Sequence, residues 1–592
     1  MTLKFPHWQI LTASLLASFI LYGSTMGGQF VYDDFFFVDR PQLRQIGHLN
    51  NIWIEPMLLN AGLYRPLTTT SFSLNFLLFG ENPFTFRVFN LLLNGINAFL
   101  VFILISKLFK NSRLAVLTAL IFSFLPIHTE VVANIKSRDE LLSAFFMLLS
   151  WIVLEKAVSD NKRLGWKLLA LSSFLFLLAI FSKELVVFGI IAPIVFYWIK
   201  NKPHWIRLIK VTSVYIPVIL IYLVLRLRIL GIYALGSDDL NYVSNPLKVE
   251  DFTTTFLTGL GILYTYTFKT FIPLGLSATY HFNHFPLVKS LFASWQAIAG
   301  LVILLIGIIA VIHKKIRPTP VGAGFLIFFA NYFVFSQFLF KAGDMLAERW
   351  MYFPSIGLAA ILGFLIEQIY RKNNFIALGI LGIILLLFTA VIFPRNKVWL
   401  SNEALYKSMV DDAPNSIQGH YSLAQIYFTK GEVQSAKKHL EEAFKIYPKH
   451  PSAVDLASAI AQKEGNVEEA ERLLKYSLTL DPALIKTYLA LGGLYYSQGN
   501  YEKALYFFEQ NMHLSDRVKN EEVLFYAATL AKLGRYQESI STIQKLLPPD
   551  YSSNRLRVIL AFNYFKLGKL DDAQKIIPNA TEEQLESLIK NF

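Results

Sequence analysis

The chain has 592 residues, 54% of them hydrophobic and 15% aromatic, and it contains no cysteine. A soluble protein could not keep that share of apolar side chains out of water, and without cysteine neither a disulfide framework nor a thiolate metal site is available. The net charge of +13 does not indicate nucleic-acid binding, because lysines and arginines gather in short loops between apolar runs, as in polytopic membrane proteins that contact lipid.

Apolar runs that approach the length of a membrane span recur through the first two thirds of the chain. A helix needs about 20 residues to cross the hydrocarbon core, so the shorter runs require flanking residues. The first run lacks a small-residue cleavage site and is interpreted as an uncleaved span. The runs are 8–27, 86–109, 113–127, 140–158, 165–182, 184–199, 208–231, 253–275, 291–312, 321–340, 351–370 and 374–394.

The positions of basic residues orient these runs. Lysines and arginines after the second, fourth and sixth runs predict cytoplasmic loops. If every run crossed, the basic segment 313–317 would lie outside, so one later run must fail to cross. The run 253–275 is the best candidate for a re-entrant or interfacial helix, because polar residues interrupt it. We expect about eleven spans, with the amino terminus inside and the carboxyl-terminal part outside.

Two adjacent carboxylates, Asp33 and Asp34, follow the first run within the aromatic stretch F-V-Y-D-D-F-F-F. The predicted topology places them at the outer face of the membrane. Adjacent side chains point in different directions, so the two acids are expected to have separate tasks, one as a base and one orienting a sugar, a metal or an arginine. The alternative interpretation is a solvated cap beside a span.

A second polar segment, 126–140, lies in the second outer loop. Lys136 and Arg138 are cations at the bilayer surface, suited to a lipid-linked phosphate. His128 and Glu130 suggest a metal pair, but two ligands without a third are weak evidence, so a divalent metal is left open. Ordinary positioning of charged side chains at the interface is the alternative.

Two further segments carry an arginine on the outer side. In A-E-R-W-M-Y-F-P-S-I-G, Arg349 lies at the mouth of a span and needs an acidic partner, either Glu348 or an acid from an outer loop. In L-Y-R-P-L, Arg65 follows Tyr64 in the first outer loop and is expected to pair with an acid or a phosphate. With His128, Glu130 and Asp139, the residues Tyr64 and Glu348 are predicted to support the site.

The carboxyl-terminal part has lower hydrophobicity and a repeat of 34 or 35 residues. Glycines recur at 431, 465, 499, 534 and 568, each with a small residue seven positions before it and another five after it. Small residues let the two helices of a hairpin approach closely, and the glycine makes the turn between them. The pattern predicts about five tetratricopeptide repeats and a capping helix in the last twelve residues.

These features together resemble the GT-C type membrane glycosyltransferases, and most closely the family of transmembrane and tetratricopeptide-repeat O-mannosyltransferase-like proteins. The resemblance rests on F-V-Y-D-D, Y-R-P-L, P-I-H-T-E-V-V-A-N-I-K-S-R-D-E-L-L and A-E-R-W-M-Y-F-P-S-I-G-L, followed by the repeats. It departs from the family where Arg87 and Asn94 replace histidines around Asn90. The expected fold is all-α, with a GT-C-like membrane domain over 1–398 and a tetratricopeptide-repeat α-solenoid over 399–592.

The resemblance implies an inverting transferase that uses a polyprenyl-phosphate-linked sugar, often mannose, and modifies Ser or Thr of exported proteins held by the repeats. It makes Asp33 or Asp34 the base, Asp33 being favoured, with Lys136, Arg138, Arg349 and Arg65 toward the donor phosphate. A hydroxyl needs a carboxylate to take its proton, and a leaving phosphate needs fixed cations. The compact loops favour a bacterial inner membrane with a periplasmic site. The alternatives are a membrane-anchored scaffold for envelope or pilus assembly, and transfer to a glycan or a lipid.

Overall fold

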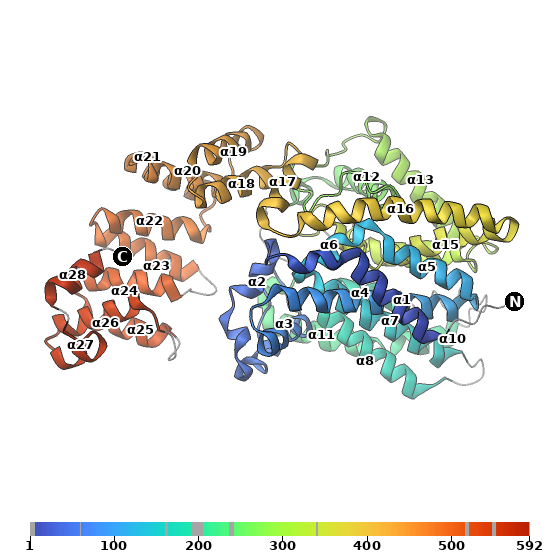
Figure 1. Cartoon of the computed structure of the whole chain (residues 1–592), viewed down its shortest axis with the longest axis horizontal. Helices are drawn as coiled ribbons and strands as arrows, with labels where there is room; N and C mark the ends of the chain where they lie inside the picture. The colour runs from blue at the N-terminus through green and yellow to red at the C-terminus, as the bar shows by residue number, and fades with distance from the viewer. Residues whose placement is uncertain are drawn as a thin grey trace. The chain divides into compact units, whose positions relative to one another are not determined.

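A computed structural model describes residues 6–59, 61–159, 164–191, 205–235, 242–338, 341–514, 520–547, 552–579 and 581–590. Within these residues the chain is almost entirely helical, and its only β-type pairing is an isolated bridge between Leu58 and Leu63. The all-α prediction is confirmed. The chain divides into two compact units, Met1–Gly419 and His420–Phe592 (Figure 1), and each is described by itself.

The first unit contains the apolar helices. Several of them begin with a proline, which has no N–H to leave unpaired in the first turn. Its α-helices are α1 (His7–Tyr22), α2 (Phe35–Val38), α3 (Pro66–Phe79), α4 (Pro83–Phe109), α5 (Ser112–Phe124), α6 (Thr129–Ala133), α7 (Arg138–Val158), α8 (Trp166–Ser182), α10 (Trp205–Ser213), α11 (Ile216–Leu230), α12 (Phe252–Phe271), α13 (Trp295–Ile312), α14 (Pro320–Tyr332), α15 (Ser355–Lys372), α16 (Asn374–Val398) and α17 (Asn402–Asp412).

Six helical segments among the described residues are long and apolar enough to cross a membrane, and a seventh is possible if the bent pair 112–124 and 126–133 is one span. The chain is therefore an integral membrane protein in its first unit. The predicted number of eleven spans is not confirmed by this count. Of the expected run 184–199, residues 192–199 lie outside the described residues, and the run 253–275 corresponds to the single helix α12.

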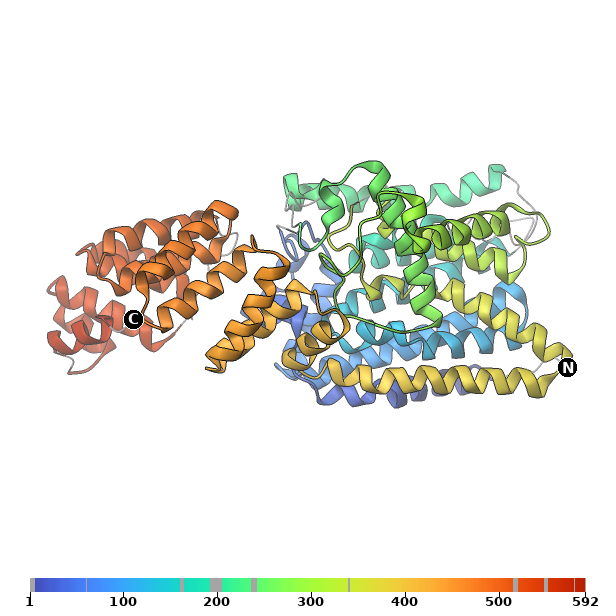
Figure 2. The same cartoon turned by 90° about the horizontal axis from the view of Figure 1, so that it is seen from above.

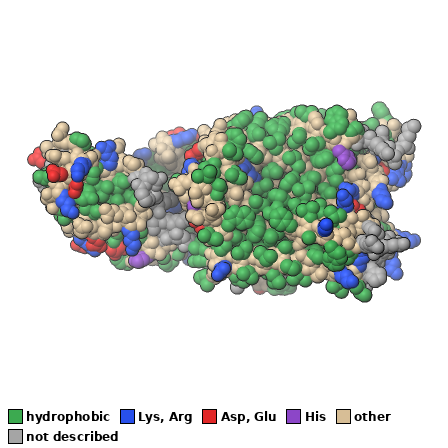
Figure 3. Space-filling model, turned by 90° about the horizontal axis from the view of Figure 1, so that it is seen from below, with side chains coloured by type: hydrophobic (Ala, Val, Ile, Leu, Met, Phe, Trp, Pro, Cys, Tyr) green, Lys and Arg blue, Asp and Glu red, His purple; other side chains and the backbone are tan. Residues whose placement is uncertain are grey.

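The apolar helices pack side by side and leave their outer faces hydrophobic. Helix α4 packs against α1, α5 and α7, and α16 runs lengthwise beside α1 and α15 (Figure 2). Hydrophobic side chains cover most of the face of this unit seen in Figure 3, as expected of a surface in contact with lipid. Along α16, Ile383, Leu386 and Leu387 are all exposed.

Short one-turn helices and loops lie between the apolar helices and position the polar residues. The 3-10 turn Tyr32–Asp34 carries the adjacent acids, Ile135–Ser137 precedes α7, Glu184–Ile191 follows α8, and Glu348–Met351 precedes α15. Helix α17 belongs to the first unit, although it follows the last apolar helix. Its residues Leu405 and Met409 are buried against Val31 and Trp399.

The second unit confirms the repeat prediction. The five predicted turn glycines all have positive φ, between 73° and 85°, which L-amino acids with a side chain rarely adopt. The small residues at the predicted helix contacts, such as Ala424 and Ala436, are buried. The helices are α18 (Ile417–Thr429), α19 (Val433–Ile446), α20 (Pro451–Lys463), α21 (Val467–Leu480), α22 (Ile485–Ser497), α23 (Tyr501–Leu514), α24 (Asn520–Lys532), α25 (Tyr536–Leu546), α26 (Asn554–Lys566), α27 (Leu570–Ile576) and the terminal α28 (Glu582–Lys590).

Candidate active site

The two adjacent acids have different surroundings. Asp34 is buried, and its two carboxylate oxygens accept hydrogen bonds from the backbone N–H groups of Val31 and Lys136, both at 2.9 Å. Burial raises the pKa of Asp34 to about 7, against these two N–H bonds and the nearby Arg87 guanidinium. Asp34 therefore holds the loop that follows α1 to the turn before α7.

Asp33 is half-buried, and its carboxylate has no hydrogen-bond or ion-pair partner among the residues that the structure describes. Burial raises its pKa, while the charges of Lys136 and Arg349 act in the opposite direction. The group is thus a carboxylate with unused acceptor capacity near two cations. Of the two acids, only Asp33 has oxygens available for a substrate.

The segment just before the turn that carries Asp33 is anchored by Arg87, a fully buried residue of α4. Its guanidinium donates to the carbonyl oxygens of Gly28 and Gln29, at 2.5 Å each, and of Ala133 and Trp399, at 3.3 Å each. Arg87 occupies a position where the resembled family has histidine, and here it joins three separate segments of the chain. Asn94, at the other such position, donates to Ser18 and accepts the hydroxyl hydrogen of Tyr352.

Arg349 is paired with acids from two other segments. Its side chain donates to Glu130 Oε1 at 2.7 Å and to Asp344 Oδ2 at 2.5 Å, and its backbone N–H donates to Glu130 Oε2 at 2.9 Å. The two carboxylates, with Asp33 nearby, raise the pKa of Arg349 further and keep it charged. Asp344 keeps 26% of its side chain exposed and lies 3.6 Å from His281.

Glu348, the neighbour of Arg349, binds different partners. Its carboxylate accepts hydrogen bonds from the hydroxyl of Tyr280 at 2.5 Å and the backbone N–H of Ser277 at 2.6 Å, and it lies 3.4 Å from Arg395. Of the two partners expected for Arg349, Glu348 is not the one used, and the alternative, an acid from another loop, is Glu130. Adjacent residues in a one-turn helix cannot face each other, which explains the difference.

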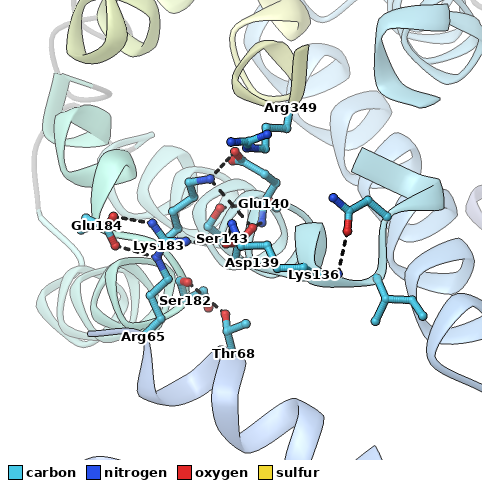
Figure 4. Close-up of polar contacts among 12 residues, drawn as sticks. Arg65, Thr68, Lys136, Asp139, Glu140, Ser143, Ser182, Lys183, Glu184 and Arg349 are labelled. Atoms are coloured by element: carbon cyan, nitrogen blue, oxygen red, sulfur yellow. Dashed lines mark hydrogen bonds and ion pairs between the residues drawn. The ribbon is translucent and has the colours of Figure 1, made fainter. Parts of the chain in front are cut away.

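A buried ion network lies at the start of α7. Arg65 forms two hydrogen bonds with Glu184, at 2.5 and 2.8 Å, and one with Asp139 at 2.5 Å. Lys183 pairs with Glu140 and lies 3.8 Å from Asp139. Figure 4 shows Arg65 and Lys183 reaching from separate elements toward these carboxylates. Burial opposes ionisation of Glu184, yet Arg65 lowers its pKa to about 2, so the pair is ionised.

Lys136 is the least engaged cation of this group. It is buried, and its ammonium lies 3.4 Å from Asp139, with no other partner among the described residues. An ammonium can donate three hydrogen bonds, so most of its capacity is unused. Its backbone N–H is bound to Asp34, which fixes where the side chain begins.

Arg138 is placed away from this group. Its guanidinium donates to Asn90, Asn75 and the carbonyl oxygens of Ser71 and Phe86, at 2.9 to 3.3 Å. It also lies over the rings of Phe72, Phe86 and Phe89. The side chain is 1% exposed, so the structure shows it joining α3, α4 and α7 rather than facing Asp33.

The remaining predicted residues have structural partners. His128 contacts Ser355 Oγ at 2.8 Å and packs against Phe122 and Tyr352, whereas Glu130 binds Arg349, so the two do not form a ligand pair. Tyr64 donates to the carbonyl oxygen of Trp53. In the described part of the chain, no group of three or more His, Asp or Glu side chains is placed to hold a metal ion.

Sequence reasoning assigned no role to several residues that complete these contacts, among them Glu184 and Lys183 of the buried ion network. Asp344 and Glu140 complete the ion pairs of Arg349 and Lys183. Arg87 binds the segment just before the turn that carries the acids, and Asn402 binds the turn itself. Arg87 had a signal, because a charged residue within an apolar run is rare unless it is bonded. Asn402 had no such signal in the sequence, since it lies at the start of an ordinary polar helix.

Comparison with known proteins defines the class. Residues 66–230 match the family model described as dolichyl-phosphate-mannose-protein mannosyltransferase. Residues 417–450 and 484–518 match models of the tetratricopeptide repeat. The chain is thus similar to a membrane mannosyltransferase family over part of its first unit, and tetratricopeptide repeats follow in its second unit, as its motifs indicate.

The chain is homologous to proteins that are named protein O-mannosyl-transferases. Human protein O-mannosyl-transferase TMTC1 is 26% identical over 511 residues, covering 75% of this chain and 56% of that protein. Human TMTC4 is 27% identical over 503 residues, covering 73% and 66%. Drosophila melanogaster Tmtc1 is 32% identical over 179 residues, covering 29% and 20%. The chain therefore spans little more than half the length of the TMTC1 relative.

Proposed function

We propose that this chain is a protein O-mannosyltransferase that moves a mannose-type sugar from a polyprenyl-phosphate donor to a Ser or Thr hydroxyl of an exported protein. The names of its homologues and the matched mannosyltransferase family support the transferred group. The observation that carries the proposal is the contrast between the adjacent acids: Asp34 is bound by two backbone N–H groups, and Asp33 keeps its oxygens free beside two cations.

Asp33 is the proposed general base. A hydroxyl is a weak nucleophile at neutral pH, so a carboxylate within hydrogen-bond reach takes its proton as the oxygen attacks the anomeric carbon. The new bond joins the acceptor oxygen to that carbon, and the bond from the carbon to the phosphate oxygen breaks. A single displacement from the opposite side inverts the anomeric centre, and polyprenyl phosphate leaves.

Lys136 and Arg349 are the proposed cations for the donor phosphate. Negative charge grows on the leaving phosphate, and cations that are already in place stabilise it without rearrangement. This role is supported by the unused donor capacity of Lys136 and by the electrostatic effect of both cations on Asp33, the proposed base. Arg65 is bound to Asp139 and Glu184, and its proposed role is to support this arrangement through these contacts rather than to bind the donor.

The site is proposed to lie at the periplasmic face of a bacterial inner membrane, where a lipid-borne donor arrives from the bilayer and the acceptor from water. The repeats are proposed to hold the acceptor polypeptide, since such arrays present extended binding surfaces. A mannose-type sugar on an acceptor protein distinguishes this function from transfer to a glycan or lipid.

The test compares wild type with Asp33→Asn and Asp34→Asn in membranes supplied with radiolabelled polyprenyl-phosphate mannose, followed by mass analysis of the labelled products. We expect Asp33→Asn to lower transfer by about 10²- to 10⁴-fold, the usual contribution of a general base. Full transfer by Asp33→Asn would overturn this role. The scaffold alternative predicts a different result. Neither variant would lower labelling, but deletion of residues 420–592 would abolish the phenotype that the intact protein confers on cells.

A further inference from the structure

The residue before Asp33 has an unusual backbone conformation. Tyr32 has φ of +53°, in the left-handed region that residues with a side chain rarely adopt. Such a conformation persists only when surrounding contacts hold it. Because φ and ψ of Tyr32 set the direction in which the chain continues, they also set where the Asp33 carboxylate points.

Helix α17 and the residues before it supply the contacts that hold this turn. The backbone N–H of Tyr32 donates to Asn402 Oδ1 at 2.8 Å, and the N–H of Gln29 donates to the carbonyl oxygen of Leu400 at 2.9 Å. The rings of Tyr32 and Tyr406 meet edge to face with centroids 6.5 Å apart. Each contact joins residues about 370 positions apart in the chain, so the turn is not formed by local sequence alone.

The approach of the two segments is close. A Cβ added at Gly28 would lie 3.0 Å from the Cα of Leu400 and 3.1 Å from the carbonyl oxygen of Trp399. Val31 is fully buried against Trp399, Leu405 and Met409. These contacts leave little room for the turn to shift relative to the start of α17.

Asn402 is itself fixed in place. It is the first residue of α17, and Ser401 before it caps the helix by accepting the N–H of Ala404 at 3.2 Å. Two turns later in the helix, Met409 accepts from Thr279, and at the end of the helix Asp412 lies 3.7 Å from Arg395. Asn402 therefore presents its side-chain oxygen from a helix bound to the membrane unit at both ends.

We propose that Asn402 is a positioning residue for Asp33: by accepting the N–H of Tyr32, it holds the left-handed turn that aims the Asp33 carboxylate. The helix that leads into the repeat array is thereby part of the active site. This inference rests on the proposed function of Asp33, and it adds a residue from outside the matched glycosyltransferase region 66–230.

The test uses full-length protein with Asn402→Leu, which has a similar size but no acceptor, and Asn402→Asp, which keeps the acceptor oxygen. Ser401→Ala is the matched control, because it weakens the cap of α17 and leaves the contact with Tyr32 in place. Hydrogen exchange of the Tyr32 N–H measures the contact, and transfer from radiolabelled polyprenyl-phosphate mannose in membranes measures kcat and the KM for the donor.

We expect faster exchange at Tyr32 in Asn402→Leu and a kcat that falls by about 10- to 100-fold at unchanged KM, since a small misplacement of a reacting group has effects of this size. Asn402→Asp and Ser401→Ala should keep slow exchange and a kcat within about threefold of wild type. If Asn402→Leu does not fold, Asn402→Ala gives the same comparison with a smaller side chain.

The proposal is overturned if the Tyr32 N–H exchanges rapidly in Asn402→Leu while kcat stays at the wild-type level, or if Asn402→Asp loses as much activity as Asn402→Leu. Failure of the proposed function is a separate result. It would appear as full transfer by Asp33→Asn, whatever the exchange of Tyr32 shows.

Discussion

Asp34 accepts the backbone N–H of Lys136 at 2.9 Å, a bond between residues 102 positions apart in the chain. The same carboxylate accepts the N–H of Val31. One acid of the adjacent pair is thus used to join two loops that are far apart in the chain, and it fixes where the Lys136 side chain begins. This division of tasks leads to distinct expectations for the two acids and for their neighbours.

Asp34→Asn is expected to lower stability. Asparagine offers one acceptor oxygen where two N–H groups now bind, so one buried N–H loses its partner, at a cost of about 1–3 kcal/mol. Burial also raises the pKa of Asp34 to about 7, from 3.8. Wild type therefore gains stability from this group as the pH falls from 7 toward 3.8, whereas Asp34→Asn does not. Thermal unfolding in detergent between pH 4 and 8 measures both effects, and equal melting curves would contradict them.

The pH dependence of transfer should report Asp33. A base works when ionised, and burial raises the pKa of Asp33 above 3.8. The rate should therefore fall as the pH drops through that raised pKa. In Lys136→Gln, which lacks a cation that favours the ionised form, the acid limb should move to higher pH. Lys136→Arg keeps the charge and is the control. An acid limb at the same pH in all three proteins would exclude Asp33 as its origin.

Lys136→Gln should also lower the rate of sugar transfer from the donor. If its unused hydrogen-bond capacity serves the donor phosphate, removing the charge should cost about 10²- to 10³-fold in kcat, as for other groups that stabilise transition-state charge. Steady-state kinetics with polyprenyl-phosphate mannose measure the loss. Arg138→Gln provides the contrast: the protein should lose stability, because Arg138 binds Asn90, Asn75 and two carbonyl oxygens.

Arg87→Met is expected to destabilise the first unit by about 2–4 kcal/mol, because four carbonyl oxygens lose a charged donor. Arg44→Met is the control with fewer contacts: Arg44 donates to one carbonyl oxygen, that of Val38, and its partly exposed pair with Glu81 contributes about 0–1 kcal/mol. Unfolding in detergent distinguishes them. A melting temperature for Arg87→Met that matches the control would show that the four contacts contribute little.

In the repeats, Gly465→Ala should destabilise the protein by about 1–2 kcal/mol, because φ is +82° and alanine is strained there even though nothing lies within 4 Å of the new Cβ. Gly493→Ala is the matched change within helix α22, also with nothing within 4 Å, and should stabilise by about 0.5–1 kcal/mol. Hydrogen exchange in α20 to α23 measures the two opposite shifts.

The repeats could be predicted in detail because their pattern is local. Each hairpin is formed by residues within one repeat, so the spacing of Gly431 and Gly465 with their small neighbours contains the geometry. The polar residues of the first unit were found by their type, since charges in an apolar chain are rare. Their partners were not predictable in the same way.

The partners depend on contacts between distant segments. Lys136 and Arg138 are two residues apart and were grouped as cations for one phosphate, yet the start of α7 turns Arg138 toward α3 and α4. Glu348 and Arg349 are adjacent, and they bind different segments because neighbouring side chains of a one-turn helix point in different directions. Which acid of the Asp33 and Asp34 pair is free depends on a backbone N–H at Lys136, which no pattern around residue 33 reveals.

The position of α17 has a practical consequence for dividing the protein. A shortened chain that ends at Val398, where the last apolar helix stops, would lose Leu400, Asn402 and Tyr406 together with their bonds to Gln29 and Tyr32. A chain that ends at Gly419, the last residue of the first unit, would keep them. Anyone who wishes to study the membrane part without its repeats should therefore cut after α17, not at the edge of the hydrophobic sequence.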